Sequence, residues 1–165
     1  MKKLLGALTA ATAVWASCVG GEPAQTERGI VASEIRKAVK DVSRIEFEAR
    51  DRAVLYSADG KVIGSARYSS PFAEAARGFR GPVPVLVIFT NKGTVRTVRP
   101  LPNQEDARFW RKLLAAALFD SWSGFPVREA AQLEVDAVTS ATYSSRGAIG
   151  STGKLIEEEA LSNGK

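Results

Sequence analysis

Apolar residues recur at helical spacing in three segments of the chain. A first stripe predicts an amphipathic helix over residues 31–42, through Val31, Ile35, Ala38, Val39 and Val42. A second stripe at i, i+3, i+4, i+7 and i+8 predicts a helix over residues 105–120, through Trp110, Leu113, Leu114, Ala117 and Leu118. We interpret Trp110 as part of the core rather than as a cofactor platform.

The third segment predicts a last helix over residues 145–161. It contains Gly147, Gly150 and Gly153, and each glycine costs about 1 kcal/mol relative to alanine in a helix. The helix therefore needs tertiary packing to form. Because the glycines are spaced by three, they are expected to line one side and to allow a close backbone approach.

Extended segments alternate with turn signals in the first half of the chain. Residues 53–56 and 61–68 flank Asp59-Gly60, a strong hairpin signal. Residues 83–89 are apolar on both faces, as in a buried strand, and Asn91-Lys92-Gly93 returns the chain into residues 94–98. A further short strand is an option at residues 133–136. The pattern predicts an α+β fold, a mainly antiparallel sheet flanked by helices.

The N-terminal residues have the order of a secretory signal. Met1-Lys2-Lys3 is followed by an apolar stretch to Val14 and then by Trp15-Ala16, which predicts a signal peptide over residues 1–16. Alternatively, residues 1–17 precede Cys18 as the lipidated residue of a lipoprotein, although Trp15 fits that site poorly. A transmembrane anchor needs about 20 apolar residues, more than this segment offers. We expect a periplasmic or extracytoplasmic protein, with a lipid anchor to the membrane surface left open.

The remaining chain fits one domain. Residues 17–28 are polar and include Pro23, so we expect a flexible lead-in. Residues 29–165 then form a single domain, which is long enough to bury about two-thirds of its unfolded surface.

The composition narrows the chemistry of that domain. The chain has no histidine and one cysteine, Cys18, which excludes disulfides, Cys/His zinc sites, histidine-ligated haem and histidine-based triads from the domain. No calcium-loop pattern is present, so we expect no metal. The net charge of +5 falls to 5 − 2 = +3 without Lys2 and Lys3. The basic residues are scattered, which argues against a nucleic-acid partner but leaves a weak attraction to acidic partners or anionic lipid.

The segment Asp136-Ala137-Val138-Thr139-Ser140-Ala141-Thr142 carries the most specific signal. It resembles the motif of the FMN-binding domain family, which reads Asp, two variable residues, Ser or Thr, usually Gly, then Ala and a final Thr or Ser. The segment from Gly78 to Val87 also resembles the glycine-proline entry to a central strand of that family. The likeness covers residues 59–161 in consistent order. It lacks the Pro-Gly-Leu-Gly segment that some members carry after an acidic pair.

The resemblance implies a cofactor and its attachment. In that family a separate Mg-dependent flavin transferase joins FMN, through its phosphate, to the hydroxyl of the final motif residue, here Thr142. The family includes peripheral flavin subunits of sodium-pumping quinone reductases and of related ferredoxin-linked Rnf-type complexes. The residues that the resemblance places around the cofactor are Gly78, Phe79, Gly81, Pro82, Asp136, Thr139, Ser140, Ala141 and Tyr143.

Two physical arguments bear on this segment. The N–H groups that open the last helix favour an anion, so a phosphodiester at Thr142 would be stabilised there, and Arg146 is a candidate partner for the phosphate. The simpler interpretation is that Thr142, Ser144 or Ser145 caps the helix. Phe79, Tyr143 and Trp122 are candidate neighbours of the flavin ring, although the sequence favours core or surface packing for each of them.

The function that follows is an exported electron carrier with no substrate turnover of its own. Its partners would be the flavin transferase during maturation and a membrane-bound reductase or other redox protein afterwards. Two alternatives stay open: a flavin-holding sensor or accessory module of a membrane complex, and a cofactor-free exported binding lipoprotein.

Overall fold

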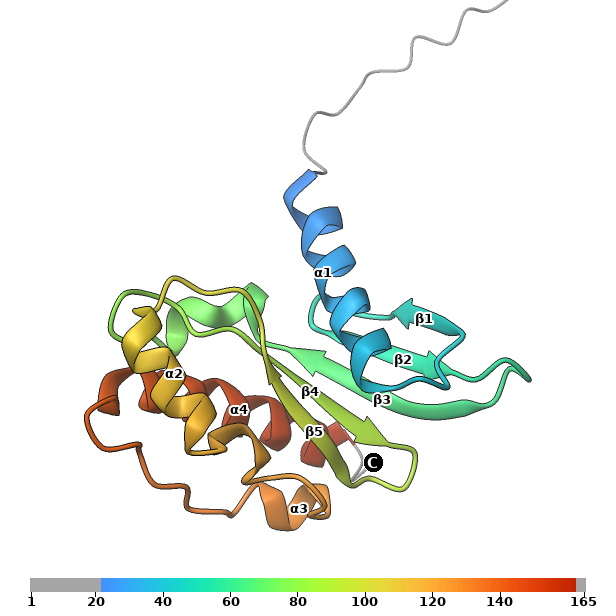
Figure 1. Cartoon of the computed structure of the whole chain (residues 1–165). Helices are drawn as coiled ribbons and strands as arrows, with labels where there is room; N and C mark the ends of the chain where they lie inside the picture. The colour runs from blue at the N-terminus through green and yellow to red at the C-terminus, as the bar shows by residue number, and fades with distance from the viewer. Residues whose placement is uncertain (1–21, 163–165) are drawn as a thin grey trace, which may run out of the picture.

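The computed structural model describes residues 22–162 of the chain (Figure 1). The predicted signal peptide and Cys18, with its two alternative processing sites, lie outside the described residues. Among the helices described, none combines the length and the apolar character needed to cross a membrane.

A five-stranded antiparallel meander forms the centre of the molecule, in the order β1-β2-β3-β4-β5. The strands are β1 (Arg44–Phe47), β2 (Arg52–Tyr56), β3 (Val62–Tyr68), β4 (Val85–Thr90) and β5 (Val95–Pro100). Both predicted hairpins are confirmed, and Gly60 and Gly93 take the left-handed φ values of 76° and 71° that their turns require. The edge strand β1 was not predicted, because four alternating residues are too short a pattern to stand out.

Both faces of the sheet are covered, and β4 shows this most clearly. Val85, Val87 and Phe89 enter one core, while Leu86 and Ile88 enter the other. This confirms the prediction that the segment is buried on both sides. The predicted α+β architecture is therefore present, as one domain in which helices lie on either side of an antiparallel sheet.

One face is covered by α1 (Glu22–Ala38), whose Val31 and Ile35 are fully buried, as is Val39 directly after it. The helix begins and ends earlier than the predicted 31–42. It includes residues 22–28, which were predicted to belong to the flexible lead-in. Pro23 is compatible with this start, because a proline in the first turn removes an N–H that would have no partner within the helix.

The other face is covered by α2 (Ala107–Ala115), α3 (Val127–Ala130) and α4 (Thr142–Ser162), with the 3₁₀ helices η1 (Ser70–Ala75) and η2 (Leu118–Asp120) between elements. The predicted helix over 105–120 ends early because Ala117 has a left-handed φ of 51°, which interrupts the α-helix before η2. The strand considered at 133–136 is wrong: these residues are irregular, and Leu133 and Val135 pack against the core from a loop. The short α3 was not predicted.

Candidate functional site

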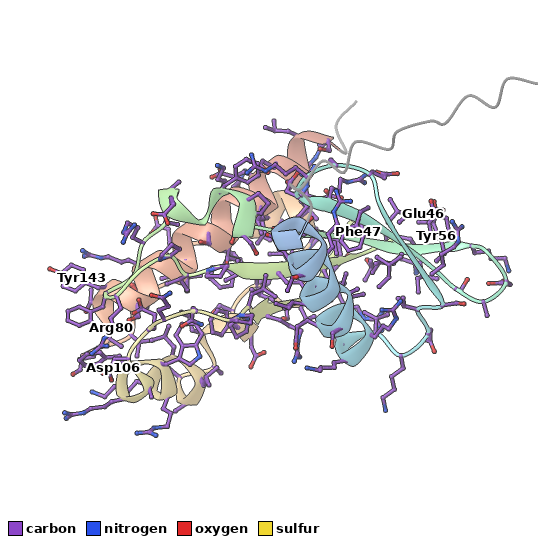
Figure 2. All side chains as sticks on the ribbon, turned by 90° about the horizontal axis from the view of Figure 1, so that it is seen from above. Glu46, Phe47, Tyr56, Arg80, Asp106 and Tyr143 are labelled. Atoms are coloured by element: carbon purple, nitrogen blue, oxygen red, sulfur yellow. The ribbon has the colours of Figure 1, made fainter. Side chains whose placement is uncertain are left out.

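A small cavity of about 250 Å³ opens where α4 begins. Three segments that are distant in sequence meet there: the loop after η1, the start of α2 and the first turn of α4. Figure 2 shows Arg80, Asp106 and Tyr143 gathered at this end of the molecule, opposite Glu46, Phe47 and Tyr56. The cavity is lined by Phe79, Phe109, Ser140, Ala141, Thr142, Tyr143 and Ser144.

Half of the residues of the predicted site line this cavity. Phe79 and the four residues from Ser140 to Tyr143 line it, whereas Asp136 and Thr139 are solvent-exposed and do not. Gly78, Gly81 and Pro82 also do not line it, but they form the loop that carries Phe79. Phe109 and Ser144 were missed, because in sequence they are an ordinary helix aromatic and a serine of a Ser-rich run.

Thr142 is the first residue of α4 and is half-buried. The hydroxyls of Ser144 and Ser145 are both engaged, with Ser145 Oγ donating to the carbonyl of Ala141 at 2.9 Å and accepting from the N–H of Val138 at 3.0 Å. By contrast, no residue within the described part of the chain hydrogen-bonds to the Thr142 hydroxyl. Ser145 thus ties the loop to the helix, and Thr142 Oγ1 stays available to react.

The turn before Thr142 explains why glycine is common at the fifth motif position. Ser140 has a left-handed φ of 64°, which costs a residue with a Cβ about 1–2 kcal/mol. The turn is closed by a hydrogen bond from the N–H of Ala141 to the carbonyl of Val138 at 3.0 Å. Ser140 therefore supports the same backbone path as glycine, at an energetic cost.

Glu105 joins the loop of Phe79 to the first turn of α4. Its carboxylate accepts hydrogen bonds from the backbone N–H groups of Phe79 at 3.1 Å, Arg80 at 2.8 Å and Gly81 at 3.3 Å, and from the hydroxyl of Ser144. Partial burial acts to raise the pKa of Glu105. The hydrogen bonds from Ser144 and the three N–H groups outweigh it, so the pKa lies below its usual value. The site therefore contains a fixed negative charge held largely by backbone donors.

Two glycines let these segments approach closely. A Cβ on Gly147 would lie 2.8 Å from the backbone nitrogen of Gly78, and a Cβ on Gly78 would lie 2.7 Å from Glu105 Oε1. The predicted close approach of α4 is confirmed at Gly147. A Cβ on Gly150 would only touch the Ala76 Cβ at an ordinary 3.6 Å, and Gly153 faces open space.

Aromatic rings form the outer wall of the cavity. The Phe79 ring packs edge-on against Phe109 at a centroid distance of 5.7 Å and lies 6.5 Å from Tyr143. Phe79 is 58% exposed and Tyr143 is 67% exposed, which is unusual for large rings in contact. Trp122, in contrast, is fully buried in the core and is excluded as a ring neighbour. Trp110 packs against that core, as predicted.

Two arginines in the segments that form the cavity differ in whether they pair with an acidic side chain. Arg80 Nη2 lies 3.7 Å from Asp106 Oδ2, and Asp106 also caps α2 by accepting from the N–H of Arg108. Arg146 is exposed and forms no ion pair with any described residue, so it is free to approach an anion near the start of α4.

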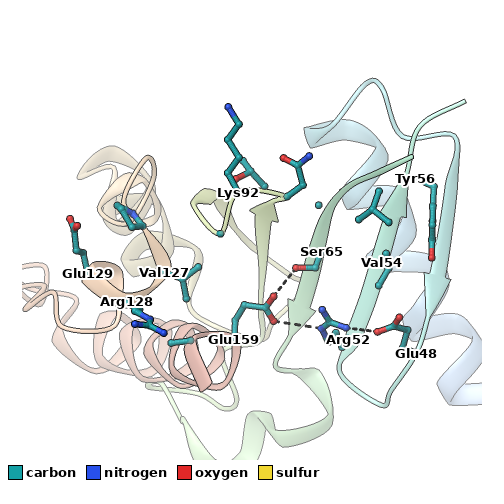
Figure 3. A pocket seen from close by; sticks show the side chains of 17 residues that line it. Glu48, Arg52, Val54, Tyr56, Ser65, Lys92, Val127, Arg128, Glu129 and Glu159 are labelled. Atoms are coloured by element: carbon teal, nitrogen blue, oxygen red, sulfur yellow. Dashed lines mark hydrogen bonds and ion pairs between the residues drawn. The ribbon is translucent and has the colours of Figure 1, made fainter. Parts of the chain in front are cut away.

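The cavity fits FMN in its chemistry. Phe79, Phe109 and Tyr143 supply an aromatic wall for an apolar ring system. The hydroxyl of Thr142, which has no hydrogen bond to a described residue, and the N-terminus of α4 suit a phosphate. A larger cavity, of about 800 Å³, lies elsewhere, between β2, β3, α3 and the end of α4 (Figure 3). It contains no motif residue, and size alone does not make it the functional site.

The comparison with protein families agrees with this assignment. Residues 78–157 match the model of a family described as FMN-binding domain, and this span contains every residue that lines the small cavity. A comparison with curated proteins found no match.

Proposed function

The chain belongs, through residues 78–157, to the FMN-binding domain family, and from this premise we propose that it is an exported electron carrier with FMN esterified to Thr142. The observation that carries the proposal is the position of Thr142. Its hydroxyl is unengaged among the described residues, lines the cavity and stands at the start of α4.

The attachment step is a phosphoryl transfer. Thr142 Oγ1 attacks the phosphorus of an activated flavin nucleotide, for which a flavin dinucleotide is the fitting class of donor. A P–O bond forms, the pyrophosphate bond of the donor breaks, a nucleoside monophosphate leaves and the hydroxyl proton is released. The product is a phosphodiester with one negative charge, which the N-terminal N–H groups of α4 stabilise. A separate transferase catalyses the step in this proposal.

When bound, FMN takes up and releases one or two electrons. The chain's own residues then orient it and set its electrostatic environment. Phe79 and Tyr143 provide aromatic surface for the ring, and the loop of Phe79 is fixed by Glu105. The carboxylate of Glu105 does not line the cavity but bonds to the loop of Phe79 and to Ser144, and a negative charge nearby disfavours the addition of electrons.

Export gives the covalent bond a physical rationale. Outside the cytoplasm, a dissociated FMN would be diluted into a large volume and not replaced by synthesis. The charged, apolar and small-residue order of residues 1–16 supports export, and a membrane-bound reductase would be the natural electron donor. Alternatively, a lipid attached to Cys18 would hold the exported protein at the membrane surface instead of leaving it to diffuse freely.

The test is flavinylation in a host that carries a flavin transferase. The exported protein is expected to gain the mass of one FMN minus one water and to show flavin fluorescence after denaturing electrophoresis. Thr142→Ala should abolish the adduct, whereas Thr142→Ser should retain it because the hydroxyl remains. Thr97→Ala, on β5 and outside the motif, is the matched control and should be fully flavinylated. A colourless wild-type protein, or an adduct that survives in Thr142→Ala, contradicts the proposal.

A further inference from the structure

Five aliphatic hydroxyl groups lie close together in sequence around the attachment point, on Thr139, Ser140, Thr142, Ser144 and Ser145. The first two residues are exposed and the last two are fully buried, whereas Thr142 is half-buried and lines the cavity. Attachment to Thr142 therefore requires a backbone that holds this one hydroxyl where the donor can reach it. Of the two buried serines, Ser145 is the one whose side chain bonds to the backbone before and at Thr142.

Ser145 makes several hydrogen bonds to this stretch of backbone. Its N–H donates to the carbonyl of Ala141 at 3.0 Å. Its hydroxyl donates to the same carbonyl at 2.9 Å, with the carbonyl of Thr142 also within reach at 3.1 Å. The hydroxyl oxygen in turn accepts from the N–H of Val138 at 3.0 Å. One buried side chain thus binds both ends of the turn from Val138 to Ala141.

Thr152, on the same helix, shows how a buried hydroxyl serves a helix alone. It is fully buried, and its hydroxyl donates to the carbonyl of Ala148, four residues earlier, at 2.8 Å. Ser145 makes the corresponding bond to Ala141 but also accepts from Val138, which lies outside the helix. The bond within the helix is the usual one for a serine or threonine. The bond from Val138 is additional, and it serves the loop that carries the motif.

The turn that Ser145 binds is strained. Ser140 has a left-handed φ of 64°, and a residue with a Cβ persists in that conformation only where the surrounding contacts fix it. Val138 uses its carbonyl to accept from the N–H of Ala141 at 3.0 Å, and it uses its own N–H to bond Ser145. Without the Ser145 hydroxyl the turn keeps its strain and loses an anchor. The backbone directly before Thr142 is then expected to shift or to fluctuate.

We infer that Ser145 is a positioning residue for flavin attachment: by binding both ends of the strained turn, it fixes the hydroxyl of Thr142 at the cavity for phosphoryl transfer. This role rests on the proposed function. Ser145 acts through the backbone and contributes no reacting atom. Because a displacement of about 1 Å can slow a reaction by about two orders of magnitude, a small shift of the turn is sufficient to matter. The functional segment thus extends beyond the motif, into the first turn of α4.

The test measures attachment to the full-length protein, purified without flavin from a host that lacks the transferase. It is incubated with a purified flavin transferase, flavin adenine dinucleotide and Mg²⁺, and initial rates over a range of apoprotein concentrations give kcat and KM. Ser145→Ala should lower kcat about tenfold and change KM by less than about threefold, because alignment is lost while the binding surface is kept. Ser145→Thr should retain most of kcat, since a threonine hydroxyl also bonds the carbonyl four residues earlier, as Thr152 does.

A second comparison tests whether Ser145 acts through the turn. Ser140→Gly relieves the left-handed φ, so in that background Ser145→Ala should lower kcat only about threefold. The same pair of variants decides the matter if Ser145→Ala alone does not fold, because glycine stabilises the turn. An equal fall of kcat in both backgrounds, or no fall in the Ser140→Gly background when Ser145→Ala is unfolded, would overturn the inference.

The matched control is Ser151→Ala, which also removes a buried serine hydroxyl from α4, one that donates to the carbonyl of Val83 at 2.8 Å. In urea denaturation it should lose about as much stability as Ser145→Ala, yet it should change kcat by less than about twofold. If both variants lower kcat equally, the effect is one of general stability and the positioning role is wrong. Attachment to Ser145→Ala as fast as to the wild type, or faster, would also overturn it.

Amide hydrogen exchange of the flavin-free protein, followed by NMR, separates this inference from the proposed function. The N–H of Val138 should exchange about tenfold faster in Ser145→Ala than in the wild type and should be unchanged in Ser151→Ala. If this holds but the wild type takes up no flavin, the proposed function is contradicted while the anchored turn stands. If the wild type is flavinylated on Thr142 but Ser145→Ala shows neither faster exchange nor slower attachment, the positioning role alone is contradicted.

Discussion

The two ends of α4 each have a carboxylate bound to a serine hydroxyl, but the two carboxylates are stabilised differently. At the N-terminal end, Glu105 accepts from Ser144 and from three backbone N–H groups. At the C-terminal end, Glu159 accepts from Ser65 Oγ at 2.9 Å (Figure 3) and also from Arg67 Nε at 2.8 Å. Neutral backbone donors hold the first carboxylate, and a guanidinium holds the second.

At the C-terminal end of α4, buried ion pairs hold the helix against the sheet. Glu159 is only 2% exposed, and Arg67 also binds Asp51 Oδ2 at 2.7 Å. Burial acts to lower the pKa of Arg67, but the bonds to Glu159 and Asp51 outweigh it, and the pKa is raised. At the N-terminal end the rings of Phe79 and Tyr143 remain exposed, and the Thr142 hydroxyl has no hydrogen-bond partner among residues 22–162. The C-terminal end of α4 thus holds the helix against the sheet. Because this contact does not involve the N-terminal end, the cavity there can remain open for a cofactor.

The largest expected effect lies at the closed end. Arg67→Met leaves buried Asp51 without its cation and leaves buried Glu159 only Arg52 Nε, 3.6 Å away, which should cost about 3–5 kcal/mol of the free energy of unfolding. Urea denaturation followed by circular dichroism measures this loss. Arg77→Met, which removes an exposed pair with Glu74, should cost about 1 kcal/mol or less. Equal losses in the two variants would show that the buried ion pairs of Arg67 stabilise the fold no more than an exposed ion pair does.

A smaller effect is expected at the open end. Glu105→Ala leaves three N–H groups and Ser144 without their acceptor, for about 1–3 kcal/mol of stability. The loop of Phe79 should loosen, so trypsin should cut faster after Arg77 and Arg80, and flavinylation should slow. Glu105→Gln keeps a carbonyl acceptor and should recover part of both properties. The neighbouring Gln104→Ala is the control, and a loss in Gln104→Ala as large as that in Glu105→Ala would refute this role.

The same carboxylate predicts a dependence on pH. Because its pKa is lowered in the folded state, Glu105 stabilises the fold above its unfolded pKa, and this stabilisation is lost as pH falls through the folded pKa. Unfolding free energy should therefore decline from about pH 5 downward, and the decline should be shallower in Glu105→Gln. Identical pH profiles for the wild type and Glu105→Gln would argue against a lowered pKa.

The smallest effect concerns the turn before Thr142. Ser140→Gly relieves the left-handed φ and should stabilise the protein by about 1 kcal/mol, seen as a small rise in Tm. Ser121→Gly is the comparison, because Ser121 has a right-handed φ of −56° and glycine should not help there. If both substitutions shifted Tm equally, backbone strain at Ser140 would not be the cause.

Much of the fold followed from local patterns. The hairpins around Gly60 and Gly93 were predictable because both turns need a left-handed residue and glycine supplies it. The early end of α2 was not predictable, since Ala117 is a good helix former that tertiary packing places in a left-handed conformation. The edge strand β1 and the short α3 carried too few residues for a periodic signal.

The candidate site was likewise predictable only where its residues are close together in the sequence. The motif predicted Thr142 and its neighbours as site residues because they are contiguous in sequence. The resemblance of the glycine-proline loop predicted Phe79. The role of Glu105 lay outside any pattern, since its four donors come from two segments that meet only in the folded chain. Asp136 belongs to the motif but is exposed and away from the cavity, so its place in the motif has no explanation in this geometry.

The most direct test of the central claim is to locate the flavin within the tryptic peptide of residues 129–146 by tandem mass spectrometry. This peptide contains Thr139, Ser140, Thr142, Tyr143, Ser144 and Ser145, so it offers every hydroxyl near the start of α4 as an alternative. The account predicts one flavin phosphate, on Thr142 alone. A flavin on any other of these residues, or an unmodified peptide from a host with the transferase, would contradict it.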